Sequence, residues 1–86
     1  MARALTIQRT LVTPGERVRF HEKLRRKQEY YARAKVRFWA FEEASLPGAF
    51  LEFFEADDPA TLARAHAAAP DLVMDPNRVY REVELP

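Results

Sequence analysis

Two histidines are the side chains in this sequence best suited to acid–base chemistry. His21 lies in an early stretch with helical spacing, and His66 lies in a later stretch rich in alanine. Imidazole exchanges a proton near neutral pH, so a histidine held in a pocket can act as a general base. If both stretches are helices on one face of a sheet, His21, Tyr31 and His66 could line one pocket. The alternative is that each histidine is a hydrogen-bonded structural residue.

Aromatic residues gather in the middle of the chain and could form the walls of a ligand pocket. Residues 36–56 contain the single Trp and five of the six Phe. Flat apolar rings with a few polar groups among them are typical of small-molecule sites. The candidate ligand-binding residues are Tyr31, Trp39, Phe41, Phe38 and Phe53. Packing in a core or in a dimer interface explains the same residues equally well.

Other chemistries find little support. Glu42 and Glu43 are adjacent, so on a strand they point to opposite faces and cannot act as a carboxylate pair. One of them with Glu52 or Glu55 would form only a weak metal site, because no histidines have ligand spacing. The chain contains no Cys, no glycine-rich phosphate loop and no GxSxG. We therefore expect no metal and no cofactor.

The aromatic stretch has the pattern of a β-hairpin. Residues 36–41 (VRFWAF) and 49–54 (AFLEFF) are β-branched and aromatic, as strands are. Between them, Pro47 fixes φ for the second position of a turn and Gly48 tolerates the positive φ of a type II turn. In the first strand Phe38 and Ala40 share one face and Trp39 and Phe41 the other. In the second strand Phe50 and Phe54 face one way and Leu51 and Phe53 the other, so neither strand has a clean polar face. Both faces are thus expected to be buried.

Two further strands and two helices are expected around this hairpin. Residues 4–12 and 79–85 alternate apolar with polar side chains and are predicted to be the first and last strands. A helix is predicted over 14–34, beginning with Thr13 and Glu16 as a capping box. A second, thinner helix is predicted over 59–68, with Asp58 as its N-cap.

The order β-α-β-β-α-β predicts a ferredoxin-like α+β fold. Residues 1–86 are expected to form one domain, a four-stranded antiparallel sheet with two helices on one face. A chain of this size buries only about 60–65% of its unfolded surface. The other, apolar face of the sheet is left uncovered, and such a patch marks an interface. We expect a homodimer in which two sheets face each other as a barrel.

Charge is distributed unevenly. Residues 16–37 carry a net charge of +6 and residues 38–86 a net charge of −7. The simpler interpretation is that the charged side chains of the first helix are solvated. The alternative is that this basic helix binds an acidic partner. Nucleic acid is disfavoured, because the aromatic strands that would stack on bases are acidic. No apolar run is long enough to span a membrane, and the absence of Cys favours a cytoplasmic location.

The segments TPGE (13–16) and EEASLPGAFLEFFEADD (42–58), together with the layout, resemble the dimeric α/β-barrel proteins of the antibiotic-biosynthesis-monooxygenase type. The resemblance implies a small, often aromatic ligand bound between helices and sheet. Its members include cofactor-free monooxygenases, haem-degrading enzymes and isomerases. The haem-degrading branch has an Asn on the first strand, where this chain has Thr6, Gln8 and Thr10, so that activity is not implied.

Three functions follow as expectations. The first is a bacterial homodimeric protein that binds a small ligand. The second is a cofactor-independent monooxygenase or isomerase, with His21 or His66 as base and Tyr31 and Trp39 as walls. An enzyme of this kind needs a closed pocket of several hundred Å³ that contains a histidine. The third is an interaction module that uses the basic first helix.

Overall fold

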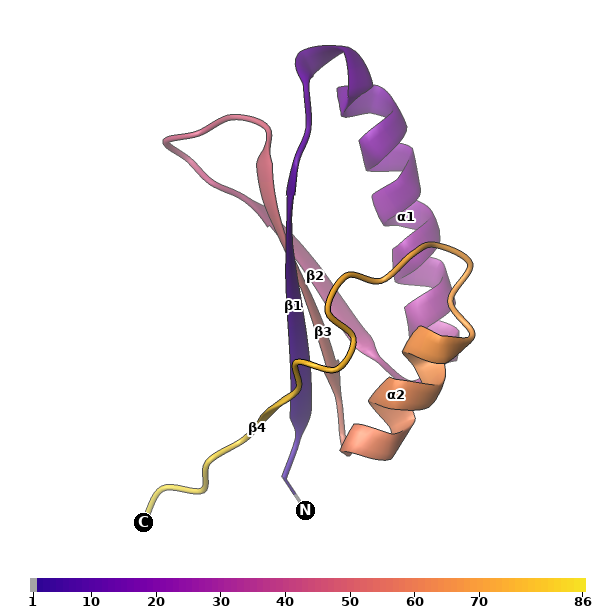
Figure 1. The fold of residues 1–86 in the computed structure, drawn as a ribbon, viewed down its shortest axis with the longest axis vertical. Helices are drawn as coiled ribbons and strands as arrows, with labels where there is room; N and C mark the ends of the chain where they lie inside the picture. Colours follow the sequence, from indigo (N-terminus) through magenta and orange to yellow (C-terminus); the bar gives the residue numbers. More distant parts are fainter. Residues whose placement is uncertain (1) are drawn as a thin grey trace.

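A computed structural model describes residues 2–86 and confirms the βαββαβ order. Four antiparallel strands form one sheet in the order β2-β3-β1-β4, and both helices lie on the same side of it (Figure 1). The elements are β1 (Ala4–Leu11), η1 (Pro14–Glu16), α1 (Arg17–Arg33), β2 (Arg37–Glu42), β3 (Ala49–Ala56), α2 (Pro59–Ala67) and β4 (Tyr80–Arg81). The predicted ferredoxin-like architecture is therefore present.

The hairpin turn forms as its sequence predicts. Gly48 has a φ of 95°, and the Ala49 N–H donates to the Leu46 carbonyl at 3.1 Å. The Glu42 carboxylate accepts a further bond from the Gly48 N–H at 2.9 Å. These bonds hold the two hairpin strands in register and place their side chains on defined faces.

The two helices start differently. At α2 the Asp58 side chain accepts a hydrogen bond from the Thr61 N–H at 2.8 Å, as an N-cap should. The capping box predicted at the first helix is wrong, because Thr13 makes no side-chain cap bond and a 3-10 turn, η1, precedes α1. The Glu16 carboxylate instead pairs with Arg19 at 2.9 Å.

The predicted last strand, 79–85, is also wrong in length. Only Tyr80 and Arg81 pair with β1, opposite Leu5 and Ala4. The antiparallel direction explains this, because residues after Arg81 run beyond the start of β1 and have no strand beside them. One more bond, from the Glu82 N–H to the Arg3 carbonyl at 2.9 Å, ends the pairing.

The face of the sheet that the helices cover contains buried polar side chains. Cross-strand partners share a face, so the rows Thr6–Phe54–Phe38 and Gln8–Glu52–Ala40 lie under the helices. The rows Ile7–Phe53–Trp39 and Arg9–Leu51–Phe41 lie on the open face, which no element of residues 2–86 covers (Figure 1). The apolar rows of the open face are flanked by charged side chains, which form the ion pairs Arg9–Glu43 and Arg37–Glu55.

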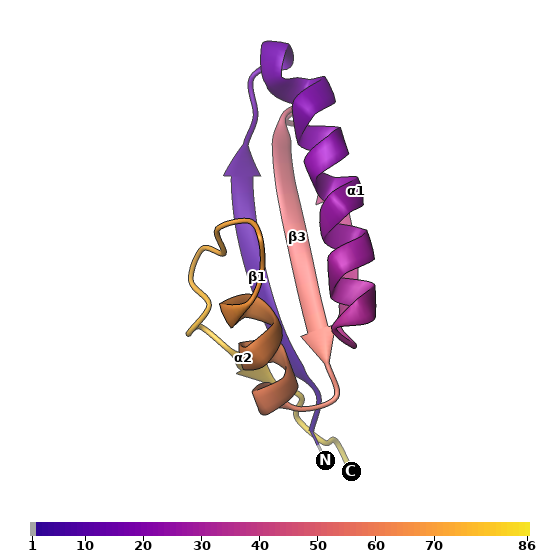
Figure 2. The same ribbon diagram turned by 90° about the vertical axis from the view of Figure 1, so that its right-hand side faces the viewer.

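Two sets of contacts hold the helices on the sheet. The main core lies between the end of α1, α2 and the sheet, around the buried side chains of Tyr31, Phe54 and Leu62. At the other end of α1, the Phe20 and Phe50 rings pack with centroids 4.7 Å apart. Figure 2 shows that α2 covers only the first part of β1, so the part near Leu11 lies beside α1 alone. No helix within residues 2–86 is long and apolar enough to cross a membrane.

Candidate functional site

The space between the helices and the sheet contains an unusual amount of polar chemistry for so small a domain. The buried polar or charged residues among 2–86 are Thr6, Gln8, Lys27, Glu52 and His66. Three come from the inner face of the sheet and one from each helix. Burying such groups costs free energy unless each has a partner. Every buried side-chain nitrogen and oxygen in the described chain has one.

The first group of these residues is built around Glu52 in the central strand β3. Its Oε1 accepts a hydrogen bond from Lys27 Nζ at 2.6 Å, and its Oε2 accepts one from Gln8 Nε2 at 3.0 Å. Lys27 reaches it because its position on α1 falls on the same inner stripe as Phe20 and Tyr31. The result is an ion pair sealed between helix and sheet.

The second group is centred on His66 of α2. Its Nδ1 lies 2.8 Å from the Tyr31 hydroxyl, and its Nε2 lies 2.7 Å from the Thr6 hydroxyl. Burial lowers the pKa of His66 below its ordinary value and raises the pKa of Tyr31. The imidazole is therefore neutral at pH 7, with one nitrogen donating and the other accepting. A neutral imidazole between two hydroxyls is chemically able to take up a proton.

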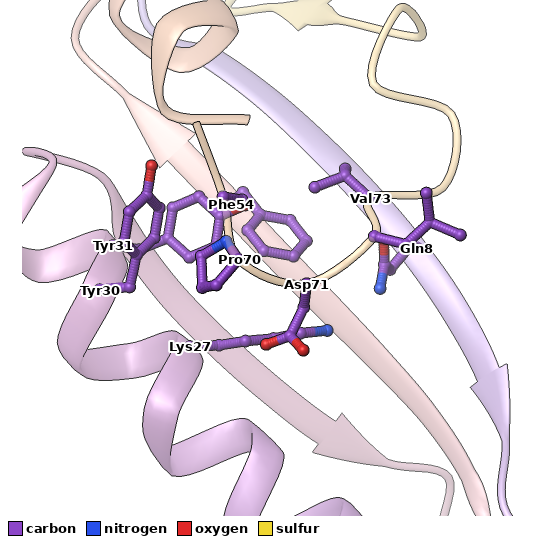
Figure 3. Close-up of a pocket in the computed structure, with 10 residues that line it drawn as sticks. Gln8, Lys27, Tyr30, Tyr31, Phe54, Pro70, Asp71 and Val73 are labelled. Carbon is purple, nitrogen blue, oxygen red and sulfur yellow. The ribbon is translucent and has the colours of Figure 1, made fainter. Parts of the chain in front are cut away.

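The enclosed cavity beside these groups is small. Its volume is about 10 Å³, enough for roughly one water molecule. Figure 3 shows Gln8, Lys27, Tyr31 and Phe54 at its walls, with Pro70, Asp71 and Val73 closing it from outside. This cavity is therefore far smaller than the closed pocket of several hundred Å³ that an enzyme of this kind needs.

The segment that closes the cavity, residues 69–77, is held weakly. We call it the cover segment. Two of its large side chains point outward, since Leu72 is 86% exposed and Met74 is half exposed, whereas Val73 is half-buried at the cavity. One hydrogen bond, from the Met74 N–H to Gln8 Oε1 at 3.0 Å, ties it to the sheet. An open groove of about 580 Å³ runs between this segment and α2, with His66 in its lining. Few buried apolar contacts mean a low free energy of local opening.

The predicted site residues are divided between three places. Tyr31 and His66 are bonded to each other, and Phe38 stacks near Tyr31 with ring centroids 6.2 Å apart. His21 is exposed, and its ring meets the edge of Phe50 at 5.9 Å. Phe50 and Phe54 are four residues apart on β3, about 13 Å. His21 therefore belongs to the far end of α1, away from His66.

The remaining three predicted residues lie on the open face of the sheet. Phe41 and Phe53 pack there with ring centroids 5.6 Å apart, and Trp39 is the cross-strand partner of Phe53. The open-face patch, as we call it, consists of Leu5, Ile7, Trp39, Phe41, Leu51 and Phe53. Phe41 and Phe53 are thus separated from the helices by the sheet, whereas Trp39 also lines an open groove at the β2 edge with Gln28 and Ala32 of α1.

Lys27, Glu52, Gln8 and Thr6 were not identified as site residues from the sequence. A signal for two of them was present. Lys27 falls on the apolar stripe of its helix, and Glu52 has the same strand parity as Phe50 and Phe54. When a helix and a strand each carry one charged residue of opposite sign on an otherwise apolar face, the pattern indicates that these two faces pack against each other. Since Lys is usually solvated, the pattern is visible only when both elements are considered together.

No group of three or more His, Asp or Glu within residues 2–86 is placed to hold a metal ion. Comparisons of the chain with protein-family models, with curated proteins and with solved structures each gave no significant match.

Proposed function

We propose that this protein is a homodimer that binds a small, partly polar aromatic molecule between its helices and its sheet. The observation that carries the proposal is that one face of the sheet has buried polar groups and the other has an exposed apolar patch. The helices cover Thr6, Gln8 and Glu52, while apolar side chains face outward from the same strands. A sheet of this kind suits an interface on one side and a site on the other.

The open-face patch supports the homodimer. Trp39 is 43% exposed and Phe41 is 58% exposed, in a row of aromatic and aliphatic side chains across three strands. Contiguous exposed apolar patches are uncommon on monomers and usually mark contacts. A two-fold axis would place this patch against itself and remove both copies from water.

The inner polar groups support the ligand. A buried ion pair contributes little to stability compared with apolar residues of similar volume, so its presence at Lys27 and Glu52 favours a binding role. Lys27 Nζ has three N–H groups, and Gln8 Oε1 is bonded to the cover segment alone among residues 2–86. Displacing the cover segment would free donors and acceptors beside the rings of Tyr30, Tyr31 and Phe54. Such a wall fits a flat ring that carries oxygen substituents.

Solution mass tests the homodimer. Light scattering on a sizing column should give twice the chain mass at micromolar concentration. Trp39→Arg and Phe53→Asp should shift the protein to the monomer, since each places a charge in the centre of the patch. The control is Leu72→Arg, on the opposite side of the sheet, which should remain dimeric. A monomeric wild-type chain would refute the homodimer.

Calorimetric titration tests the ligand site, with 1-naphthol and 2-naphthoic acid as probes. We expect binding that Gln8→Leu weakens at least tenfold, because a Leu cannot bond an oxygen substituent. Arg25→Met, at an exposed position on α1, should bind as the wild type does. Absence of heat with both probes at millimolar concentration, with the dimer intact, would refute the ligand site alone.

His66 lines the open groove beside the cover segment, and displacing that segment would favour one second function, a cofactor-independent isomerase. A freed ring nitrogen could take a proton from a carbon beside a ligand carbonyl and return it to another carbon of the same ligand, so that atoms and charge balance. The test is deuterium exchange from solvent into an enolisable probe, 2-tetralone. Exchange that His66→Gln abolishes, while the probe still binds, would support this function. An equal rate in the variant would exclude it.

A further inference from the structure

A second groove lies on the helix side, where α2 leaves the end of β1 uncovered (Figure 2). Its volume is about 300 Å³. Its apolar lining comes from Leu11, Val12 and Phe20, and one wall carries the basic residues Arg19, Lys23 and Arg26 of α1. We call it the basic groove. The remaining lining residues are Thr13 and Glu16.

The basic wall is largely free of counter-charges. Positions 19, 23 and 26 follow the spacing of one side of a helix, so their side chains line up along the groove. Arg19 pairs with Glu16 at 2.9 Å, and neither Lys23 nor Arg26 forms an ion pair with any residue of the described chain. An occupant with apolar and acidic groups would match this surface.

The last residues of the sequence have that composition, and beyond Glu82 they are exposed. We call residues 82–86 (EVELP) the tail. Val83 is 74% exposed and Leu85 is 84% exposed, although both are large and apolar. In an extended chain these two share one side and Glu84 lies on the other. Glu82 is held by Arg3 at 3.0 Å, whereas Glu84 has no ion-pair partner within residues 2–86.

The tail cannot reach the basic groove of its own chain. Figure 1 shows the tail leaving at the opposite end of the molecule from η1, where the groove begins. Glu82 is bonded to Arg3, eight residues before Leu11 on β1, which corresponds to about 27 Å along the strand. Five extended residues span at most about 18 Å. Any groove that the tail occupies belongs to a second copy.

We infer that the tail of one protomer docks in the basic groove of its partner. Val83 and Leu85 lie against the apolar lining, and Glu84 faces Lys23 and Arg26. This inference rests on the proposed homodimer and adds a second contact to it. A two-fold axis perpendicular to the 43 Å long dimension brings the tail end of one protomer beside the groove end of the other. Both tails and both grooves are then used, and the assembly closes.

Disulfide trapping tests the inference on the full chain, which has no cysteine of its own. One preparation carries Glu84→Cys and another carries Arg26→Cys, and the two are mixed under mild oxidation. We expect a disulfide-linked pair of one chain of each kind, identified by mass spectrometry. The control partner is Arg33→Cys, exposed on the same helix but outside the groove lining. It should link to Glu84→Cys at background level only.

A charge exchange supplies the second measurement. Glu84→Lys should weaken the dimer about tenfold, and Lys23→Glu with Arg26→Glu should restore it in the same chain. The inference is overturned if Glu84→Cys forms a disulfide equally well with Arg26→Cys and Arg33→Cys, or with neither. Decanoate is the competitor. If it abolishes the disulfide linkage and binds the groove more tightly than the tail does, the groove is a site for a small amphiphilic anion and the inference is overturned. A dimer that persists without linkage refutes the tail contact alone, whereas a monomer refutes the homodimer itself.

Discussion

Lys27 Nζ lies 2.6 Å from Glu52 Oε1, and the two side chains are 7% and 0% exposed. The pair joins the middle of α1 to the central strand of the sheet. A charge pair in this position is satisfied only while helix and strand keep their present spacing. The pair therefore fixes how α1 lies on the sheet and at the same time places an ammonium group at the wall of the cavity.

Removing one member of this pair should lower the free energy of unfolding much more than removing both. We expect Lys27→Met to lower the free energy of unfolding by about 3–5 kcal/mol, because it leaves the Glu52 carboxylate buried without its cation. The double variant Lys27→Met with Glu52→Leu should recover most of that loss. Urea unfolding followed by circular dichroism measures both. A double variant no more stable than the single one would show that the pair is needed for the fold itself.

His66 should make stability depend on pH. Its pKa in the folded protein is lowered by burial, so below about pH 6.5 the unfolded chain binds the proton more readily. The stability that neutral His66 contributes is complete above that pH and is lost as the pH falls towards the lowered folded-state pKa. As the pH is lowered from 7.5 to 5, the unfolding midpoint of the wild type should fall, and that of His66→Gln should change less.

Gly48 should tolerate no side chain. Its φ of 95° is unfavourable for other residues, and a Cβ there would collide with the Val12 carbonyl oxygen. Gly48→Ala should lower the free energy of unfolding by at least about 1–3 kcal/mol. Gly15→Ala is the matched control, since a Cβ at that position meets no atom within 4 Å. Thermal unfolding should separate the two variants clearly, and equal melting temperatures would contradict the turn geometry.

The carboxylate of Glu42 should titrate far below its usual range. Hydrogen bonds from the Arg17 guanidinium and from the Gly48 N–H lower its pKa to about 2. Carbon-detected NMR titration of the side-chain carboxyl measures this value directly. In Arg17→Gln the pKa should rise towards that of an ordinary Glu. A value near 4 in the wild type would show that the bond between α1 and the hairpin is not kept in solution.

The sequence predicted a structural feature correctly where that feature depends on residues close together in the chain. The Pro47-Gly48 turn and the Asp58 cap were predicted because each depends on φ preferences or on one side chain beside its own backbone. The capping box failed because Glu16 had a second nearby partner, Arg19, that competes for its carboxylate. The last strand failed because its length depends on where β1 begins, far away in the sequence.

The sequence by itself determined the order of the elements and the alternation that leaves an apolar face on the sheet. Only the tertiary structure decided which face the helices cover. The helices cover the face that carries Glu52, which joins Lys27 to Glu52 and His66 to Tyr31 and leaves Trp39 and Phe41 outside. The physical reason is that periodicity fixes which side chains share a face. The handedness of the connections and the packing of distant elements fix where that face points.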